Sequence, residues 1–108
     1  MATQLFVYYR VPKAEISLGL ACAAELIKAL ECQNLGTAKL YQREEADKPY
    51  FTLMEVIEPE QGQFKQIQDY CDKVQELAIQ CFSAFENRPA RHTEVFTELT
   101  AGALKPCA

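Results

Sequence analysis

Histidine, tryptophan and glycine are scarce in this chain, and their scarcity excludes several familiar kinds of site. Among 108 residues there is one histidine, no tryptophan and four glycines. With one imidazole and no C-x-x-C pair, a structural zinc site is not expected. The glycines form no phosphate-binding loop, and no G-x-S-x-G nucleophile turn is present. We therefore expect neither a bound metal nor a cofactor.

Runs of like charge and long apolar stretches are also lacking. The net charge is −4 and the basic residues are scattered, so binding to nucleic acid or to an anionic membrane is not expected. No stretch is long and apolar enough to span a bilayer. The first residues, MATQLFVYYR, lack the basic segment and cleavage site of a secretory signal. These absences predict a cytoplasmic protein with no nucleic-acid partner and no membrane partner.

The five cysteines are an odd number and do not form a recognisable disulfide framework. Most lie in segments of helical periodicity, where cysteine behaves as a small apolar residue. We expect reduced, structural thiols, as in a reducing compartment. Cys107 alone lies in the C-terminal tail, where we expect it to be exposed and open to oxidation.

The strongest positive signal is the alternation of two hydrophobic periods along the chain. A two-residue period predicts strands, and a period of three to four residues predicts helices. The predicted elements are strands at 4–10, 37–44, 50–58 and 91–97, and helices at 13–33 and 63–86. The order β-α-β-β-α-β is that of the ferredoxin-like α+β fold, a four-stranded antiparallel sheet with both helices on one face. We expect one domain over 1–98 and a loose tail over 99–108.

Strand alternation also divides the side chains between the two faces of the sheet. One set is predicted to lie under the helices: Leu5, Val7, Ala38, Leu40, Met54, Val56 and Val95. The other is predicted to lie on the open face: Phe6, Tyr8, Arg10, Tyr41, Arg43, Phe51, Leu53, Glu55, His92, Glu94 and Phe96. The second set is too apolar to remain bare in water. A second copy of the chain packed sheet to sheet, a ligand cleft, or both together would cover it.

The one histidine is predicted to share this open face with two carboxylates. A carboxylate beside His92, from Glu94 or Glu55, would orient the imidazole and raise its pKa, as a general base needs. Arg10, with Tyr8 beside it, would bind an anionic oxygen. The competing interpretation pairs Arg10 with Glu55 and His92 with Glu94 as a charge network at a dimer interface. The residues alone leave both interpretations open.

Three short motifs, YYRVP at 8–12, MEV at 54–56 and RHTEVF at 91–96, resemble a small bacterial family of uncharacterised proteins. That family is similar to the dimeric α+β barrel group, which includes small monooxygenases, haem-degrading enzymes, dehalogenases and decarboxylases. The resemblance implies a sheet-to-sheet homodimer but no particular activity. The motif positions that it carries over are Tyr8, Tyr9, Arg10, Glu55, Arg91, His92 and Glu94. The chain departs from the family pattern at Leu53, where a tryptophan is expected.

Together these features predict a homodimeric binding or structural protein with a small pocket on the sheet face. The pocket would take a small acidic or phenolic ligand, held by Tyr8, Arg10, Arg43 and Arg91. The alternative is a cofactor-independent enzyme of the monooxygenase or isomerase kind. In that enzyme His92 is the general base, and Glu94 or Glu55 orients it.

Overall fold

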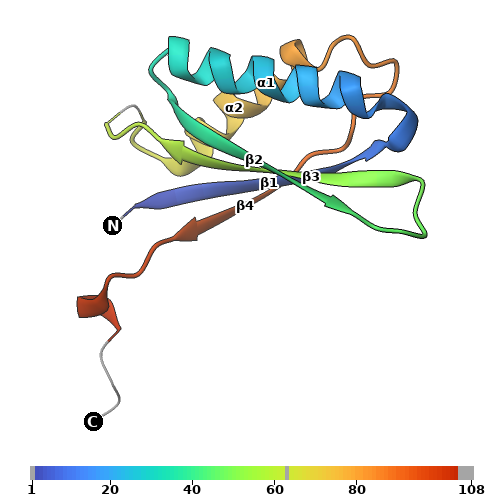
Figure 1. The fold of residues 1–108 in the computed structure, drawn as a ribbon. Coiled ribbons are helices and arrows are strands. Elements are labelled where there is room, and N and C mark those ends of the chain that lie inside the picture. The colour runs from blue at the N-terminus through green and yellow to red at the C-terminus, as the bar shows by residue number, and fades with distance from the viewer. Residues whose placement is uncertain (1, 63, 105–108) are drawn as a thin grey trace.

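The computed structural model describes residues 2–62 and 64–104, and it contains one sheet and two α-helices (Figure 1). The elements are β1 (Thr3–Pro12), α1 (Ile16–Cys32), β2 (Gly36–Glu44), β3 (Tyr50–Pro59), α2 (Ile67–Cys81) and β4 (His92–Thr97). Two short 3-10 turns, η1 (Lys13–Glu15) and η2 (Ala101–Ala103), follow β1 and β4. The predicted α+β class, with one four-stranded sheet and two helices, is confirmed.

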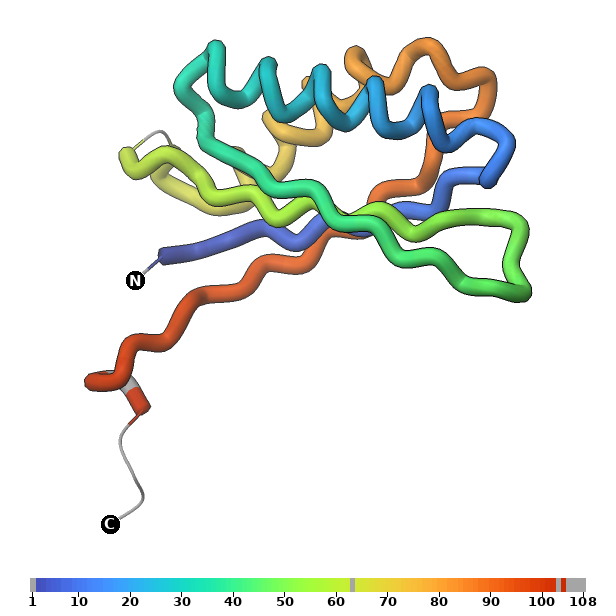
Figure 2. The backbone as a smooth tube through the Cα atoms, in the orientation of Figure 1, coloured from blue at the N-terminus to red at the C-terminus, as the bar shows by residue number. Residues whose placement is uncertain are grey.

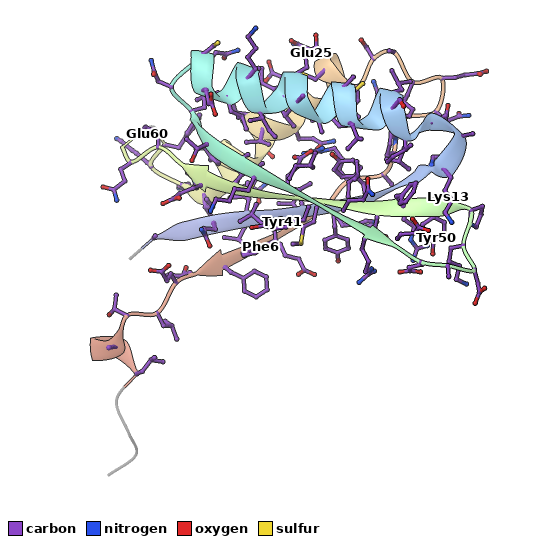
Figure 3. All side chains as sticks on the ribbon, viewed as in Figure 1. Phe6, Lys13, Glu25, Tyr41, Tyr50 and Glu60 are labelled. Atoms are coloured by element: carbon purple, nitrogen blue, oxygen red, sulfur yellow. The ribbon has the colours of Figure 1, made fainter. Side chains whose placement is uncertain are left out.

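The strands form one sheet in the order β2-β3-β1-β4, and each neighbouring pair is antiparallel. Both helices cover the same face of this sheet, which we call the helix face (Figure 1). The opposite face carries no helix, and we call it the open face. Phe6 and Tyr41 project on that side, whereas Glu25 lies on the helix layer (Figure 3). The two faces therefore have different environments, as the alternation of the strands predicted.

The core lies between the helix face and the two helices. α1 contributes Ala23, Leu26 and Leu30, and β1 contributes Leu5 and Val7, all fully buried. The helices are shorter than the predicted ranges 13–33 and 63–86. α1 starts only after the η1 turn that follows β1, and α2 stops at Cys81. Phe82 and Phe85 follow α2 in a turn, where both are buried and their stacked rings have centroids 6.1 Å apart. Their spacing is compatible with a helix, and for this reason the predicted helix was too long.

The predicted faces are correct for β1, β2 and β4, but they are wrong for β3. Residues directly opposite each other in an antiparallel pair point to the same face. Leu53, Glu55 and Ile57 pair with Tyr9, Val7 and Leu5 of β1, and all six are buried on the helix face. Phe51 joins that face opposite Val11. Thr52, Met54 and Val56 lie on the open face instead. Glu55 and His92 therefore lie on opposite faces of the sheet.

The chain beyond β4 runs away from the rest of the molecule (Figure 1). Of the predicted tail 99–108, the structure describes residues as far as 104, and Cys107 lies outside the described residues. Within the described ranges, no helix has the length and apolar character needed to cross a membrane.

Candidate functional site

The open face is a grid in which strand pairing sets the neighbours of every side chain. The row nearest the β2–β3 hairpin runs from Arg43 to Thr52 and on to Arg10. The next row contains Tyr41, Met54, Tyr8 and His92. The third contains Lys39, Val56, Phe6 and Glu94. The two arginines thus lie at one end of the face, and Lys39 and Glu94 lie farther along it.

A hollow of about 420 Å³ lies at the basic end of this grid. Its lining residues are Tyr8, Tyr9, Arg10, Arg43, Thr52, Ala90 and His92. A second hollow of about 380 Å³ shares Tyr8, Arg43 and Thr52 with the first and adds Tyr41, Gln42 and Met54. The shared residues make the two hollows one depression, which is basic at one end and apolar at the other. Its size and mixed lining are those of a small-molecule site.

Tyr8 links the depression to β4 through two contacts. Its hydroxyl donates a hydrogen bond to Glu94 Oε1 at 3.1 Å, and its ring stacks on His92 with centroids 5.4 Å apart. The hydrogen bond and the negative charge of Glu94 raise the pKa of Tyr8. Tyr8 therefore keeps its proton at neutral pH and presents a neutral phenol. Glu94 thus contacts the Tyr8 phenol, and the Tyr8 ring in turn contacts His92.

Arg10 and Arg43 lie on either side of Thr52 in the first row of the grid. The Arg10 guanidinium stacks over the Tyr50 ring at 4.7 Å, and Arg43 forms an exposed salt bridge with Glu45 at 2.9 Å. An exposed pair of this kind contributes little to stability, so the Arg43 guanidinium can exchange partners at small cost. Both arginines line the hollow of about 420 Å³.

Glu55 and Arg91 belong to a different site, inside the core. Arg91 binds Glu55 with two parallel bonds, Nη1 to Oε2 at 2.9 Å and Nη2 to Oε1 at 2.6 Å. The Tyr9 hydroxyl donates a third bond to Glu55 Oε2 at 2.6 Å. The Arg91 guanidinium also packs 5.0 Å from the Tyr9 ring centroid and 5.3 Å from that of Phe82. Glu55, Arg91 and Tyr9 form what we call the buried triad.

Opposite charges and hydrogen bonds hold the buried triad together. Burial alone would lower the pKa of Arg91, but the hydrogen bonds and charge of Glu55 outweigh it and raise that pKa. Burial and the neighbouring Glu55 charge also raise the pKa of Tyr9. The side chains of Glu55 and Arg91 are 0% and 4% exposed, so no solvent-borne ligand reaches them. The triad holds the chain at Arg91 in place, directly before β4 begins at His92.

The structure thus divides the seven predicted site residues into two groups. Tyr8, Arg10, Arg43, His92 and Glu94 share the open face, as expected. Glu55 and Arg91 meet each other under the helices, so neither the predicted Glu55–His92 contact nor the Arg10–Glu55 pair forms. Sequence reasoning missed Thr52 and Met54 in the depression. The signal for them was the strongly apolar pair Leu53 and Ile57, which should have placed their alternate neighbours on the open face.

Comparison with known proteins adds the fold alone. No family model matches this chain, and no curated protein matches it. A solved structure that it resembles is the de novo designed protein Foldit4, with a TM-score of 0.61 and 7% sequence identity. The match covers 92% of this chain and all of the designed one. The chain is therefore similar in fold to a designed protein, and this likeness carries no biochemical role.

Proposed function

We propose that the protein binds a small organic anion, a carboxylate or a phenolate, in the depression on the open face. One observation carries the proposal: two arginines, an imidazole and a tyrosine hydroxyl line a single hollow of about 420 Å³. The guanidinium groups of Arg10 and Arg43 offer the forked donors that match a carboxylate. The chain as a whole is acidic, so this concentration of positive charge is local.

The apolar end of the depression supports a ligand with a flat or aliphatic body. Tyr8 and Tyr41 supply aromatic surface there, and Met54 supplies an adaptable apolar side chain. A ligand with its acidic group toward Arg10 would place its body toward Met54. An aromatic carboxylic acid or a phenol has this polarity, whereas a bare inorganic anion uses only half of the depression.

We also propose that the open face is covered by a second copy of the chain. The face carries Phe6, Met54 and Val56 between its charged ends, together with the exposed Phe96. These partly exposed apolar side chains and the exposed Phe96 ring would be buried by a partner at this face. The order β-α-β-β-α-β and the strand order β2-β3-β1-β4 support assigning the fold to the ferredoxin-like, dimeric α+β barrel type. Four free thiols, at Cys22, Cys32, Cys71 and Cys81, support a reducing compartment such as the cytoplasm.

An enzyme is the second candidate, because His92 lines the hollow beside Arg10 and is exposed to solvent. In this version His92 accepts a proton from a ligand whose anionic form Arg10 stabilises. Glu55 takes no part, since it lies on the other face and is bound to Arg91. Glu94 acts only through Tyr8.

Titration with benzoate and with phenol, followed by amide NMR shifts, tests the binding proposal. We expect shifts at Tyr8, Arg10 and Thr52, and about tenfold weaker benzoate binding for each of Arg10→Gln and Arg43→Gln. Arg88→Gln removes an exposed arginine outside the depression and is the matched control. Binding that is equally weak in the control, or shifts confined to other surfaces, would refute the site.

A keto acid such as pyruvate, added to the protein in heavy water in place of benzoate, separates the two candidates. An enzyme with His92 as base exchanges an acidic C–H of a bound keto acid for deuterium. His92→Gln should stop that exchange while binding persists. Binding without exchange in the parent protein leaves the plain binding function.

A further inference from the structure

A C-terminal arm, Glu98–Leu104, projects from the body of the molecule (Figures 1 and 2). It starts beside the N-terminus, where the Glu98 amide donates to the Ala2 carbonyl at 2.8 Å. The Cα radius of gyration is 15.6 Å, whereas a compact domain of about 100 residues has roughly 13 Å. The molecule is therefore more elongated than a compact domain of its length.

The arm and the strand before it expose apolar side chains in succession. Val95 is 43% exposed, Phe96 55%, Leu99 56% and Leu104 60%. All six residues of β4 are exposed, so neither of its faces is covered. Because Val95 and Phe96 point to opposite faces of the sheet, a contact on one face alone cannot bury both. Exposed apolar side chains along an edge strand and its extension are typical of a segment that packs on another chain.

The arm leads away from the body of its own chain (Figure 1). The depression lies at Arg10 and the arm starts opposite Thr3, about 23 Å away along β1. Seven extended residues span at most about 25 Å, and the arm would first have to reverse its direction. The η2 turn shortens it further. A second copy, turned end for end, places the arm there without any reversal.

The charges at the two ends of the open face favour this end-for-end orientation of two copies. The arm end of the open face carries Glu58, Glu94 and Lys39, followed by Glu98, and so has an excess of negative charge. The depression end carries Arg10 and Arg43, of which Arg43 pairs with Glu45, and so has an excess of positive charge. A two-fold axis across the strands lays the acidic end of one copy over the basic end of the other. An axis along the strands would set arginine against arginine. Complementary potentials favour the first arrangement.

We propose that the C-terminal arm of each chain lies across the depression of a second copy, so that the partner completes the binding site. Leu99 then packs on the apolar floor formed by Tyr41 and Met54, and Glu98 lies at the arginine pair until an anionic ligand displaces it. This proposal rests on the homodimer and the ligand site proposed above, and it deepens both by naming the segment that closes the site. The ligand enters when the arm lifts.

The test compares Leu99→Asp with Ile79→Asp in the full chain. Ile79 is 42% exposed on α2, on the helix side, and so makes a matched control. Leu99→Asp should raise the dimer dissociation constant at least about tenfold in analytical ultracentrifugation. Ile79→Asp should leave it unchanged. A wild-type sample mixed from isotope-labelled and unlabelled chains should show Leu99–Met54 methyl contacts between chains, which needs no variant.

The outcomes distinguish this proposal from the one on which it rests. A dimer whose Leu99 makes no contact with the partner chain, and which Leu99→Asp does not weaken, overturns the arm contact and leaves the sheet-to-sheet dimer standing. A monomer at every concentration that still binds benzoate at Arg10 overturns the arm and the dimer but keeps the ligand site. A monomer that binds neither benzoate nor phenol overturns all three.

Discussion

Glu55 is fully buried in the core because three bonds satisfy its carboxylate. A buried carboxylate without partners costs several kcal/mol, so a sequence pattern normally places glutamate outside. The alternation in β3 gives two sets of side chains, and the set that contains Glu55 was predicted to lie on the open face. The partner that reverses the assignment, Arg91, lies 36 residues later. The sequence of β3 does not identify Arg91 as this partner. The predicted face was therefore wrong for Glu55, whereas it was correct for Tyr8, Arg10 and His92.

Removing one member of the buried triad should cost far more than removing the ion pair as a whole. Arg91→Met leaves the Glu55 carboxylate buried with only Tyr9, and we expect a loss of about 3–5 kcal/mol in the free energy of unfolding. The double variant Glu55→Met/Arg91→Met should recover most of this loss. A loss of roughly 1–3 kcal/mol relative to the wild type should remain, because the buried Tyr9 hydroxyl no longer has a partner. Urea unfolding at pH 7 measures all three, and a double variant no more stable than Arg91→Met would contradict the role of the pair.

At the scale of elements, the order of strands and helices followed from hydrophobic period, whereas their ends did not. Turns decide the ends, and a turn depends on contacts that a periodic pattern does not contain. The turn after α1 is an example: Leu35 is buried there, and its carbonyl accepts a hydrogen bond from the Tyr70 hydroxyl of α2 at 2.7 Å. This bond joins the first half of α2 to the start of β2. The helix predicted over 13–33 ends close to this turn, but the periodicity does not predict that α2 docks on it.

Gly36 permits this docking, and we expect Gly36→Ala to destabilise the protein. A Cβ at position 36 would press on the Glu58 carbonyl and lie 2.7 Å from the Tyr70 hydroxyl. The backbone there also has a φ of 156°, which disfavours a side chain. We expect a loss of roughly 2–3 kcal/mol, measured by thermal or urea unfolding. Gly62→Ala is the control, because its φ is 82° but no atom lies within 4 Å of the added Cβ. Equal losses at both positions would show that backbone conformation, and not the close approach, matters.

At the scale of the whole molecule, the candidate site exists only because four strands come together. β2 supplies Arg43, β3 supplies Thr52, β1 supplies Arg10 and β4 supplies His92. Alternation within single strands placed three of these four on the right face. The register between strands determines which residues are cross-strand neighbours, and it depends on the packing of the entire core. The sequence could therefore name most of the residues of the site but not its hollow.

Two buried tyrosines make the stability of the whole fold sensitive to alkaline pH. Burial raises the pKa of Tyr70 from 10.0 to about 12, and burial together with the Glu55 charge also raises the pKa of Tyr9. In the unfolded chain both phenols lose their protons near pH 10, while the folded chain keeps them. Above pH 10 the unfolded state thus binds fewer protons, and stability falls as pH rises. The slope is about 1.4 kcal/mol per pH unit for each tyrosine.

Urea unfolding from pH 8 to pH 12 should therefore show constant tyrosine-linked stability up to about pH 10 and a steep fall beyond it. Tyr70→Phe should remove about half of that fall, since one of the two phenols no longer titrates. It should also lower stability at pH 8 by about 1–3 kcal/mol, because the Leu35 carbonyl loses its donor. Tyr41→Phe is the control, because Tyr41 is 51% exposed on the open face. A fall that Tyr41→Phe reduces as much as Tyr70→Phe would show that the buried phenols are not its source.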